Sequence, residues 1–360
     1  MPSRPFQSPE VGGVLGRVPL TRRGWSLLAI VVIGVVVGVL FGTPSIHAIV
    51  APGAVALAAA LWQVHGLDRP VVDRPAELEG TVGDRLGVRL GLDDPPDRIG
   101  TVHDRVPAPL TATGNHRRVD LDAAFEYQVE LDARGEYRLG PTRVEVQDLL
   151  GLARRSFVAD GRTDVLALPR VHPLRSAALE RLATRAGVKL EPERHEFDRL
   201  REYRPTDALR DVHWKSSARH PEVEFIVKEF VKESDRGTIV LSGEATEGGA
   251  DALAEALAGL AVGLADAEVR VGLVTEGATF EPIGRPEAVG RLVAHLATVG
   301  AGRPRERGDL HLVAEGPELE AVVVEVADER LEVADLLLLG EVVVGIDHDG
   351  GPVRAGGVAD

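Results

Sequence analysis

Gly24–Phe41, with the sequence GWSLLAIVVIGVVVGVLF, carries no charged residue over eighteen positions. A helix of that length rises about 1.5 Å per residue and just crosses the hydrocarbon core of a bilayer. Gly42–Ser45 interrupts the apolar run, and Ile46–Val64 continues it with a second uncharged stretch. Trp25 and Trp62 lie near the two ends away from the turn, where indole rings favour the membrane–water interface. The pattern predicts a transmembrane helical hairpin.

A secretory signal peptide is the alternative interpretation of the first run. It is disfavoured because a second apolar run follows at once and no small-residue cleavage site separates the two. The two apolar runs predict a multi-pass cell-membrane protein with a two-helix hairpin over residues 24–66, and the positive-inside rule predicts its orientation. By the same rule, the flexible tail, residues 1–23, and all later domains lie in the cytoplasm. The turn is uncharged, and the arginines that flank the hairpin are Arg4, Arg17, Arg22 and Arg23 before it and Arg69 and Arg74 after it.

The composition limits the possible partners. The formal net charge is -15, and the absence of cysteine excludes disulfides, thiolate metal sites and cysteine nucleophiles. Arginine supplies most of the positive charge, because only four of the 41 basic residues are lysines. All four lysines lie between residues 189 and 232. Such a chain is typical of a high-GC organism living at high salt, for example a halophilic archaeon, where ions screen self-repulsion. The acidity therefore needs no basic partner to explain it, and it disfavours binding to nucleic acid.

Residues 67–170 change from long apolar runs to short alternating ones. Three examples are Arg85–Leu90, Ala124–Glu130 and Thr142–Val146, separated by turn sequences rich in aspartate, proline, glycine and asparagine. Regular short strands with turn signals between them predict an all-β sandwich, which we expect to be immunoglobulin-like.

Residues 171–236 form a connector that begins with a helical patch at Ser176–Ala186 and contains a basic island. The window Arg199–Arg219 holds six basic and three acidic side chains, a local charge of +3 in an acidic chain. The Arg204-Pro205 step predicts an extended arm, and Thr206 or Asp207 can cap a short helix that follows it. The alternation around Val227 predicts a strand at the end of this stretch.

From residue 237 the pattern alternates between strands and helices. Such alternation predicts an α/β domain over residues 237–346 with a mostly parallel, covered sheet, and residues 347–360 form a second flexible tail. The expected strands are Thr238–Leu241, Val269–Thr275, Ala321–Val326 and Glu341–Ile346, and the expected helices are Gly249–Ala265, Pro286–Val299 and Asp328–Leu338.

Several groups of residues together resemble the signature of one protein family, domain-of-unknown-function family 58. Two groups lie in the β-rich region: Arg134-Gly135-x-Tyr137-x-Leu139-Gly140-Pro141 and Asp148-Leu149-Leu150-Gly151-Leu152. The others lie in the connector: Arg201-Glu202-Tyr203-Arg204-Pro205-x-Asp207, then Arg210-Asp211-x-His213-Trp214-Lys215-x-Ser217-Ala218-Arg219, then Val227-Lys228-Glu229-Phe230. Thr206 and Val212 replace the usual glycine and isoleucine, and Leu149 and Leu150 replace a proline and a phenylalanine.

In that family the last region is similar to a von Willebrand factor type A domain, which holds Mg²⁺ with an Asp-x-Ser-x-Ser loop after its first strand. The resemblance aligns Ser242, Glu244 and Thr246 with the aspartate and the two serines of that loop. The ligands for a hard cation are therefore incomplete. We expect a degenerate loop that binds no metal, with cation binding through Glu244 as the alternative.

Asp207, Asp211 and His213 are the best candidate cluster for catalysis, because two carboxylates and one histidine can hold a metal. Arg210 and Lys215 are interleaved with them, so ion pairs explain the same residues. The sequence lacks a phosphate-binding loop, a nucleophile elbow and an H-E-x-x-H helix. We expect no catalytic residue, no cofactor and no enzymatic activity.

Two interpretations of the connector signature stay open. In one, Trp214 and Tyr203 fill a seam between the sandwich and the α/β domain, and the arginines pair with nearby acids. In the other, the stretch is a docking surface for an acidic partner or an anion, because guanidinium groups bind carboxylates or phosphates bidentately. The docking residues would be Arg201, Glu202, Tyr203, Arg204, Asp207, Arg210, Asp211, Trp214, Lys215 and Arg219.

These features predict a membrane-anchored, non-enzymatic scaffold or adaptor that binds protein partners and contacts the lipid bilayer. The family resemblance implies a MoxR-type AAA+ ATPase as one partner, in the assembly or maturation of other proteins. The alternative is a cation-dependent adhesion module or a metal-dependent enzyme that uses Glu244 and Asp207.

Overall fold

The computed structural model describes residues 20–65, 67, 71–93, 99–159, 161–188, 199–202, 226–229, 237–283, 286–340 and 342. Its internal contacts divide the chain into two units. The first unit comprises Met1–Leu78, Gly83–Asp132 and Tyr137–Val165. The second unit comprises Glu79–Val82, Ala133–Glu136 and Leu166–Asp360.

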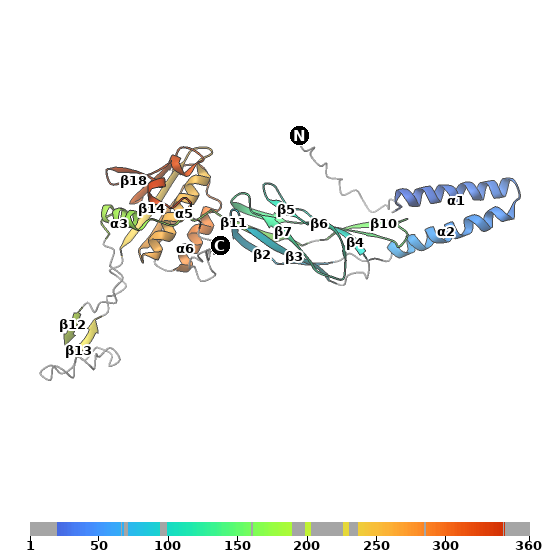
Figure 1. Ribbon diagram of the computed structural model, residues 1–360, viewed down its shortest axis with the longest axis horizontal. Helices are drawn as coiled ribbons and strands as arrows, with labels where there is room; N and C mark the ends of the chain where they lie inside the picture. Colours follow the sequence, from blue (N-terminus) through green and yellow to red (C-terminus); the bar gives the residue numbers. More distant parts are fainter. Residues whose placement is uncertain are drawn as a thin grey trace, which may run out of the picture. The chain divides into compact units, whose positions relative to one another are not determined.

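Two long apolar helices, α1 (Arg22–Leu40) and α2 (Pro44–His65), open the described chain and lie side by side (Figure 1). Only 11% and 17% of their most apolar windows is buried, so large side chains such as Ile33 and Val39 face outward. Outward-facing apolar side chains are typical of helices in lipid and not of helices in a soluble core. The prediction of two apolar helices long enough to cross a membrane is confirmed.

Glycines let the two helices approach closely. A methyl group at Gly34 would lie 2.3 Å from Val50 Cγ1, and one at Gly38 would lie 2.7 Å from the ring of His47. Small residues at a helix contact permit van der Waals packing in lipid, where no hydrophobic force drives association. The hairpin is therefore a packed pair of helices.

The first unit continues with antiparallel strands in two four-stranded sheets. The first sheet has the order β1-β3-β7-β5, with β1 (Val71–Asp73), β3 (Arg85–Asp93), β7 (Phe125–Glu130) and β5 (Thr111–Thr113). The second has the order β10-β9-β4-β6, with β10 (Arg154–Ala159), β9 (Thr142–Gln147), β4 (Ile99–Asp104) and β6 (His116–Asp120). A third sheet has the order β2-β11-β8, with β2 (Glu77–Thr81), β11 (Thr163–Leu168) and β8 (Gly135–Leu139).

The two four-stranded sheets face each other. Leu90 of β3 and Val102 of β4, from different sheets, line the same small hollow. Buried and exposed residues alternate along β7 and β9, as expected for strands with one face on a core. The predicted strands around residues 85–90, 124–130 and 142–146 are confirmed.

The second unit is built on a six-stranded sheet with the order β16-β15-β14-β17-β18-β19. Its strands are β14 (Thr238–Ala245), β15 (Arg270–Val274), β16 (Thr279–Ile283), β17 (Leu310–Ala314), β18 (Val322–Val326) and β19 (Glu329–Glu332). Its helices are α3 (Ser176–Arg185), α5 (Ala250–Asp266), α6 (Pro286–Leu296), the short 3-10 helix η3 (Leu319–Ala321) and α7 (Val333–Leu336). A separate hairpin pairs β12 (Arg199–Glu202) with β13 (Ile226–Glu229).

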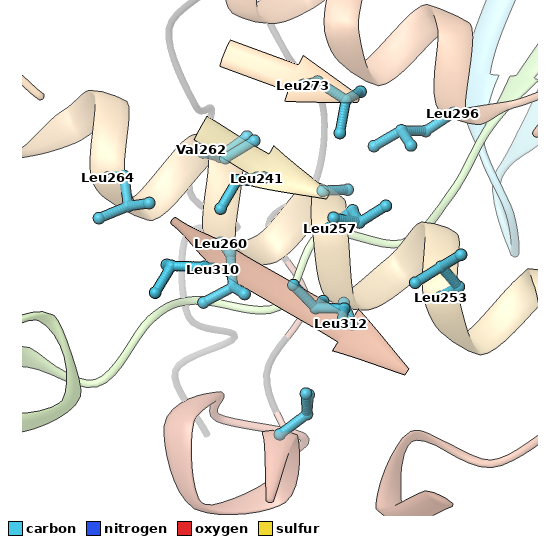
Figure 2. Packing of buried hydrophobic residues seen from close by; sticks show 14 of the residues in the cluster. Leu241, Leu253, Leu257, Leu260, Val262, Leu264, Leu273, Leu296, Leu310 and Leu312 are labelled. Atoms are coloured by element: carbon cyan, nitrogen blue, oxygen red, sulfur yellow. The ribbon is translucent and has the colours of Figure 1, made fainter. Parts of the chain in front are cut away.

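The core of the second unit lies on one face of this sheet, against α5. Leu241 of β14, Leu273 of β15 and Leu312 of β17 pack against Leu253 and Leu257 of α5 (Figure 2). The opposite face of the sheet carries a mixture of polar and apolar side chains from β14, β17 and β18: Val240, Ser242, Glu244, His311, Val313 and Glu325.

The prediction of a mostly parallel sheet is wrong. β14 runs parallel to β15 and β17, but β16, β18 and β19 each pair antiparallel with a neighbour. The helix expected at Asp328–Leu338 is confirmed only for α7 (Val333–Leu336), because β18 turns at Ala327, whose φ is 51°, into the paired strand β19. Pairing with β18 outweighs the helical spacing of the apolar residues that follow. The strand expected at Glu341–Ile346 lies outside the described residues, apart from Val342.

At the coarser level the prediction is confirmed. The chain has two N-terminal apolar helices, then a β-rich region, then an α/β region. The expected helices at residues 176–186, 249–265 and 286–299 correspond to α3, α5 and α6.

Candidate functional site

The loop aligned by resemblance with a cation-binding loop begins on β14, at the middle of the six-stranded sheet. Ser242 and Glu244 lie on the face opposite α5, and Ser242 is paired in register with His311 of the parallel strand β17. Thr246 follows the strand, just before α5. These residues, with the segment before β17, form the candidate site.

Ser242 lies in the sheet and has no exposed surface. Its Oγ accepts a hydrogen bond from Gly308 N at 2.8 Å and shares another with His311 Nδ1 at 2.9 Å. Leu310 O, at 3.4 Å, is a more distant acceptor. The hydroxyl therefore ties β14 to β17 and to the segment before it, and no face of it is open to a ligand.

His311 is the least compensated polar group of the site. Its side chain is 4% exposed, and Nε2 has no hydrogen-bond partner among the described residues. The nearest carboxylate atom, Glu244 Oε2, is 3.8 Å away. Burial holds the pKa of His311 below its usual value, and Arg307 lowers it further, whereas Glu244 and Glu325 oppose the shift. The imidazole is therefore neutral near pH 7.

Glu244 and Thr246 point to different partners. Glu244 Oε2 lies 3.5 Å from Nε of the exposed Arg303. The Thr246 hydroxyl donates to the carbonyl of Ala314 or of Glu315, at 3.3 and 3.1 Å. Ser242, Glu244 and Thr246 therefore do not converge on one point, and they do not fit a Mg²⁺ ion held by three oxygens of one loop.

A metal centre elsewhere also finds no support in the part of the chain that the structure covers. Within those residues, no group of three histidine, aspartate or glutamate side chains is placed to hold an ion. Asp207, Asp211 and His213, the cluster considered for catalysis, lie outside the described residues.

Most of the connector signature lies outside the described residues as well. Arg201 and Glu202 are described as part of β12, where they pair in register with Val227 and Ile226 of β13. The other proposed docking residues that fall outside are Tyr203, Arg204, Asp207, Arg210, Asp211, Trp214, Lys215 and Arg219.

The first unit buries a polar cluster that the sequence analysis missed. The Arg74 guanidinium pairs with both carboxylate oxygens of Asp104, at 3.1 and 2.9 Å, and the two side chains are 3% and 0% exposed. Thr142 and Tyr127 also donate to Asp104, and Arg74 Nε donates to Thr163 at 2.7 Å. Burial and the bond to Asp104 raise the pKa of Tyr127, so its hydroxyl stays protonated.

This Arg74–Asp104 cluster is structural in character. Its members come from the segment after β1 and from β4, β7, β9 and β11, so the cluster joins strands far apart in sequence. Because each residue stands alone in its own strand, no local spacing signals the cluster.

Comparisons with known proteins assign no family. No protein-family model matches the chain, and no curated protein matches it. Among solved structures, the chain matches WR4, a C. elegans MSP family member, with 9% identity and a TM-score of 0.20. That match covers 28% of this chain and 99% of the other, and so low a score carries no argument about fold or function.

Proposed function

We propose that the chain is a membrane-anchored scaffold or adaptor that binds protein partners and catalyses no reaction. The proposal rests on the contacts that Ser242 and Glu244 of β14, and Thr246 just after it, make within the fold. The hydroxyls of Ser242 and Thr246 form hydrogen bonds inside the fold, and the Glu244 carboxylate lies beside Arg303. The side chains that would bind a cation or substrate at this position are therefore already partnered, which favours a recognition module.

The proposal includes a finer description of the two regions. The first unit is an immunoglobulin-like sandwich, supported by its two facing antiparallel sheets. The second unit is a degenerate von Willebrand factor type A-like domain, supported by the three parallel strands β15-β14-β17 and the loop at the end of the central one. Both descriptions rest on the family resemblance together with these strand arrangements.

The anchor is the helical hairpin, and the domains lie on the cytoplasmic side. The outward apolar faces of α1 and α2 support insertion in a bilayer. The orientation rests on the arginines before and after the hairpin, among them the exposed Arg22 and Arg23 at the start of α1.

The proposed partner surface is the connector signature from Arg201 to Arg219. It is a basic island in a chain of net charge -15, so it suits an acidic surface on a partner. The MoxR-type AAA+ ATPase is proposed as that partner from the family resemblance, and the activity served would be assembly or maturation of other proteins.

A binding experiment tests this surface. The full chain in nanodiscs is incubated with a purified MoxR-type ATPase from the same organism, and the dissociation constant is measured by biolayer interferometry. We expect Arg201→Ala with Arg219→Ala to weaken binding at least tenfold, a loss typical of buried charged contacts. The exposed Arg305, outside the signature, is the matched control and its alanine variant should bind normally. Equal binding by all variants would reject the surface, and no binding by the unaltered chain would reject the partner.

The same preparation separates the proposal from the cation-dependent alternative. Calorimetric titration with Mg²⁺, Ca²⁺ or Mn²⁺ should release no heat that depends on Glu244, because the loop side chains do not converge. Tight binding that is lost in Glu244→Gln would favour the adhesion module or the metal-dependent enzyme instead.

A further inference from the structure

The turn Asp148–Leu152 joins β9 to β10 and is stabilised by its own polar bonds. The Asp148 carboxylate accepts hydrogen bonds from Leu150 N at 2.8 Å and from Ala153 N at 2.5 Å. Gly151 has a φ of 67°, in the left-handed region, and its N–H donates to Asp148 O. The conformation of the turn therefore depends on Asp148 and Gly151 and does not require particular side chains at the two positions between them.

Those two residues are leucines that face outward. Leu149 is 91% exposed and Leu150 is 59% exposed, so two adjacent large apolar side chains are left uncovered in the first unit. A single exposed leucine is ordinary on a protein surface, but a turn tip carrying two adjacent ones marks a contact surface.

The turn is bound to the base of α1. Thr21 donates its backbone N–H to Leu152 O at 2.8 Å, and its hydroxyl donates to Gly151 O at 2.6 Å. Gly24, in the first turn of α1, lies so close that a methyl group there would be 2.0 Å from Leu152 O. The leucine pair is thus held at the level where α1 begins.

The start of β10 is bound to the base of α2 in the same way. The Arg155 guanidinium donates to the carbonyls of Val64, His65 and Leu67 at 3.2, 2.6 and 2.8 Å. The carbonyls of Val64 and His65 are among those that the end of α2 leaves without an intrahelical partner, and Leu67 follows the helix. A small apolar cluster fills the contact between helix and turn, and its buried members are Ala60, Val64, Leu152 and Ala153.

The level of this contact is also the level of the membrane–water interface. Trp25, in the first turn of α1, is 54% exposed, and Trp62, in the last turn of α2, is 81% exposed. Exposed indole rings at the ends of spanning helices mark the headgroup layer. The exposed Arg22 and Arg23 add positive charge there, which suits lipid phosphates.

We propose that Leu149 and Leu150 insert into the interfacial layer of the same bilayer that holds α1 and α2. The inference rests on the membrane anchoring proposed above, and lipid is the occupant because the leucine pair continues the interface of the hairpin. The turn is then a third membrane contact beside the two helices. This third contact restricts the tilt of the first unit against the membrane.

Single-cysteine labelling tests the proposal directly, because the chain has no cysteine of its own. Leu149→Cys and Leu150→Cys are labelled with the environment-sensitive dye NBD in full-length protein, in nanodiscs of phosphatidylcholine and phosphatidylglycerol. Val158→Cys is the matched control, since Val158 is 50% exposed but lies six residues after Leu152, about 20 Å along an extended strand. Ile33→Cys, on the outward face of α1, reports on the hairpin itself.

We expect NBD at positions 149 and 150 to shift its emission to the blue, to be quenched by lipids with a doxyl group near the headgroup, and to lose quenching by aqueous iodide. NBD at position 158 should show the reverse. Equal iodide quenching at 149, 150 and 158 would overturn the proposal. Protection from iodide without doxyl quenching would place a second copy of the chain on the turn, and this result would also overturn it. Ile33 lies at the middle of α1, so absence of quenching at position 33 by lipids with a doxyl group deep in the acyl chain would instead overturn the membrane anchoring.

Discussion

The first and second units each bury a polar cluster, and the two clusters differ in how completely their groups are paired. Each Asp104 oxygen accepts two hydrogen bonds, from the Arg74 guanidinium and from a hydroxyl. His311 shares one ring nitrogen with Ser242 and leaves the other without a hydrogen-bond partner in the described chain. A buried charge pair is stable only when hydrogen bonds satisfy all of its polar atoms. A buried neutral imidazole costs less free energy when one ring nitrogen has no hydrogen-bond partner. The first cluster can only hold strands together, but the second can respond to pH.

Breaking the Arg74–Asp104 pair gives the largest expected effect. Arg74→Met leaves the Asp104 carboxylate charged, buried and short of two donors, so we expect the first unit to lose about 3–5 kcal/mol of unfolding free energy. The measurement is hydrogen exchange with mass spectrometry on peptides from β4 and β9, which separates the first unit from the second.

The control for this variant is Arg138→Ala. Arg138 pairs with Asp164 at 2.6 Å, but both side chains are 60% exposed, so water replaces the lost partner. We expect exchange in the same peptides to be unchanged. If the β4 and β9 peptides exchange as slowly in Arg74→Met as in Arg138→Ala, the Arg74–Asp104 cluster does not hold the strands of the first unit together, and the comparison fails.

Removing the Ser242 hydroxyl gives a smaller effect in the second unit. Ser242→Ala leaves Gly308 N and His311 Nδ1 without their partner in a buried position, and we expect a loss of about 1–3 kcal/mol. Peptides from β14 and β17 report it by hydrogen exchange. The matched control is Thr298→Ala, whose hydroxyl bonds to His295 O in an exposed setting. Equal losses in the two variants would show that the Ser242 hydroxyl is not an internal tie.

Elements with a strong apolar period were predictable from the sequence. The helices α1, α2 and α5 are long and apolar, so their positions follow from residue type with small errors at the ends. β16 was missed because Pro282 argues against a strand, although an edge strand of the sheet accepts it. β17 was missed because His311 interrupts a five-residue apolar run.

The candidate site was predictable only in part. Resemblance located Ser242, Glu244 and Thr246. The two partners of the Ser242 hydroxyl come more than sixty residues later, Gly308 from the segment before β17 and His311 from β17 itself. Cross-strand partners depend on register, which the sequence of one strand does not specify. The same reason hid Arg74 and Asp104, whose pairing needs the packing of two sheets.

The smallest expected effect is a pH dependence in the second unit. Burial lowers the pKa of folded His311 below the unfolded value of 6.5, so the unfolded chain binds a proton that the folded chain refuses. Stability therefore rises with pH and falls as pH drops through about 6.5. For one histidine the loss between pH 7 and pH 6 is at most about 0.7 kcal/mol. Hydrogen exchange of β14 and β17 peptides at both pH values measures it.

His295 must be controlled for, because burial also lowers its pKa. It therefore adds a pH dependence of stability with the same sign as that of His311. His311→Asn should remove part of the pH dependence and His295→Gln another part, so each variant is compared with the unaltered chain. Hydrogen exchange is measured only above pH 5. Arg330 holds the pKa of Glu325 below 4.5, so protonation of Glu325 destabilises the second unit only in more acidic solution. An unchanged slope in His311→Asn would mean that the pKa of His311 is the same in the folded and unfolded chains, and that the second cluster does not respond to pH.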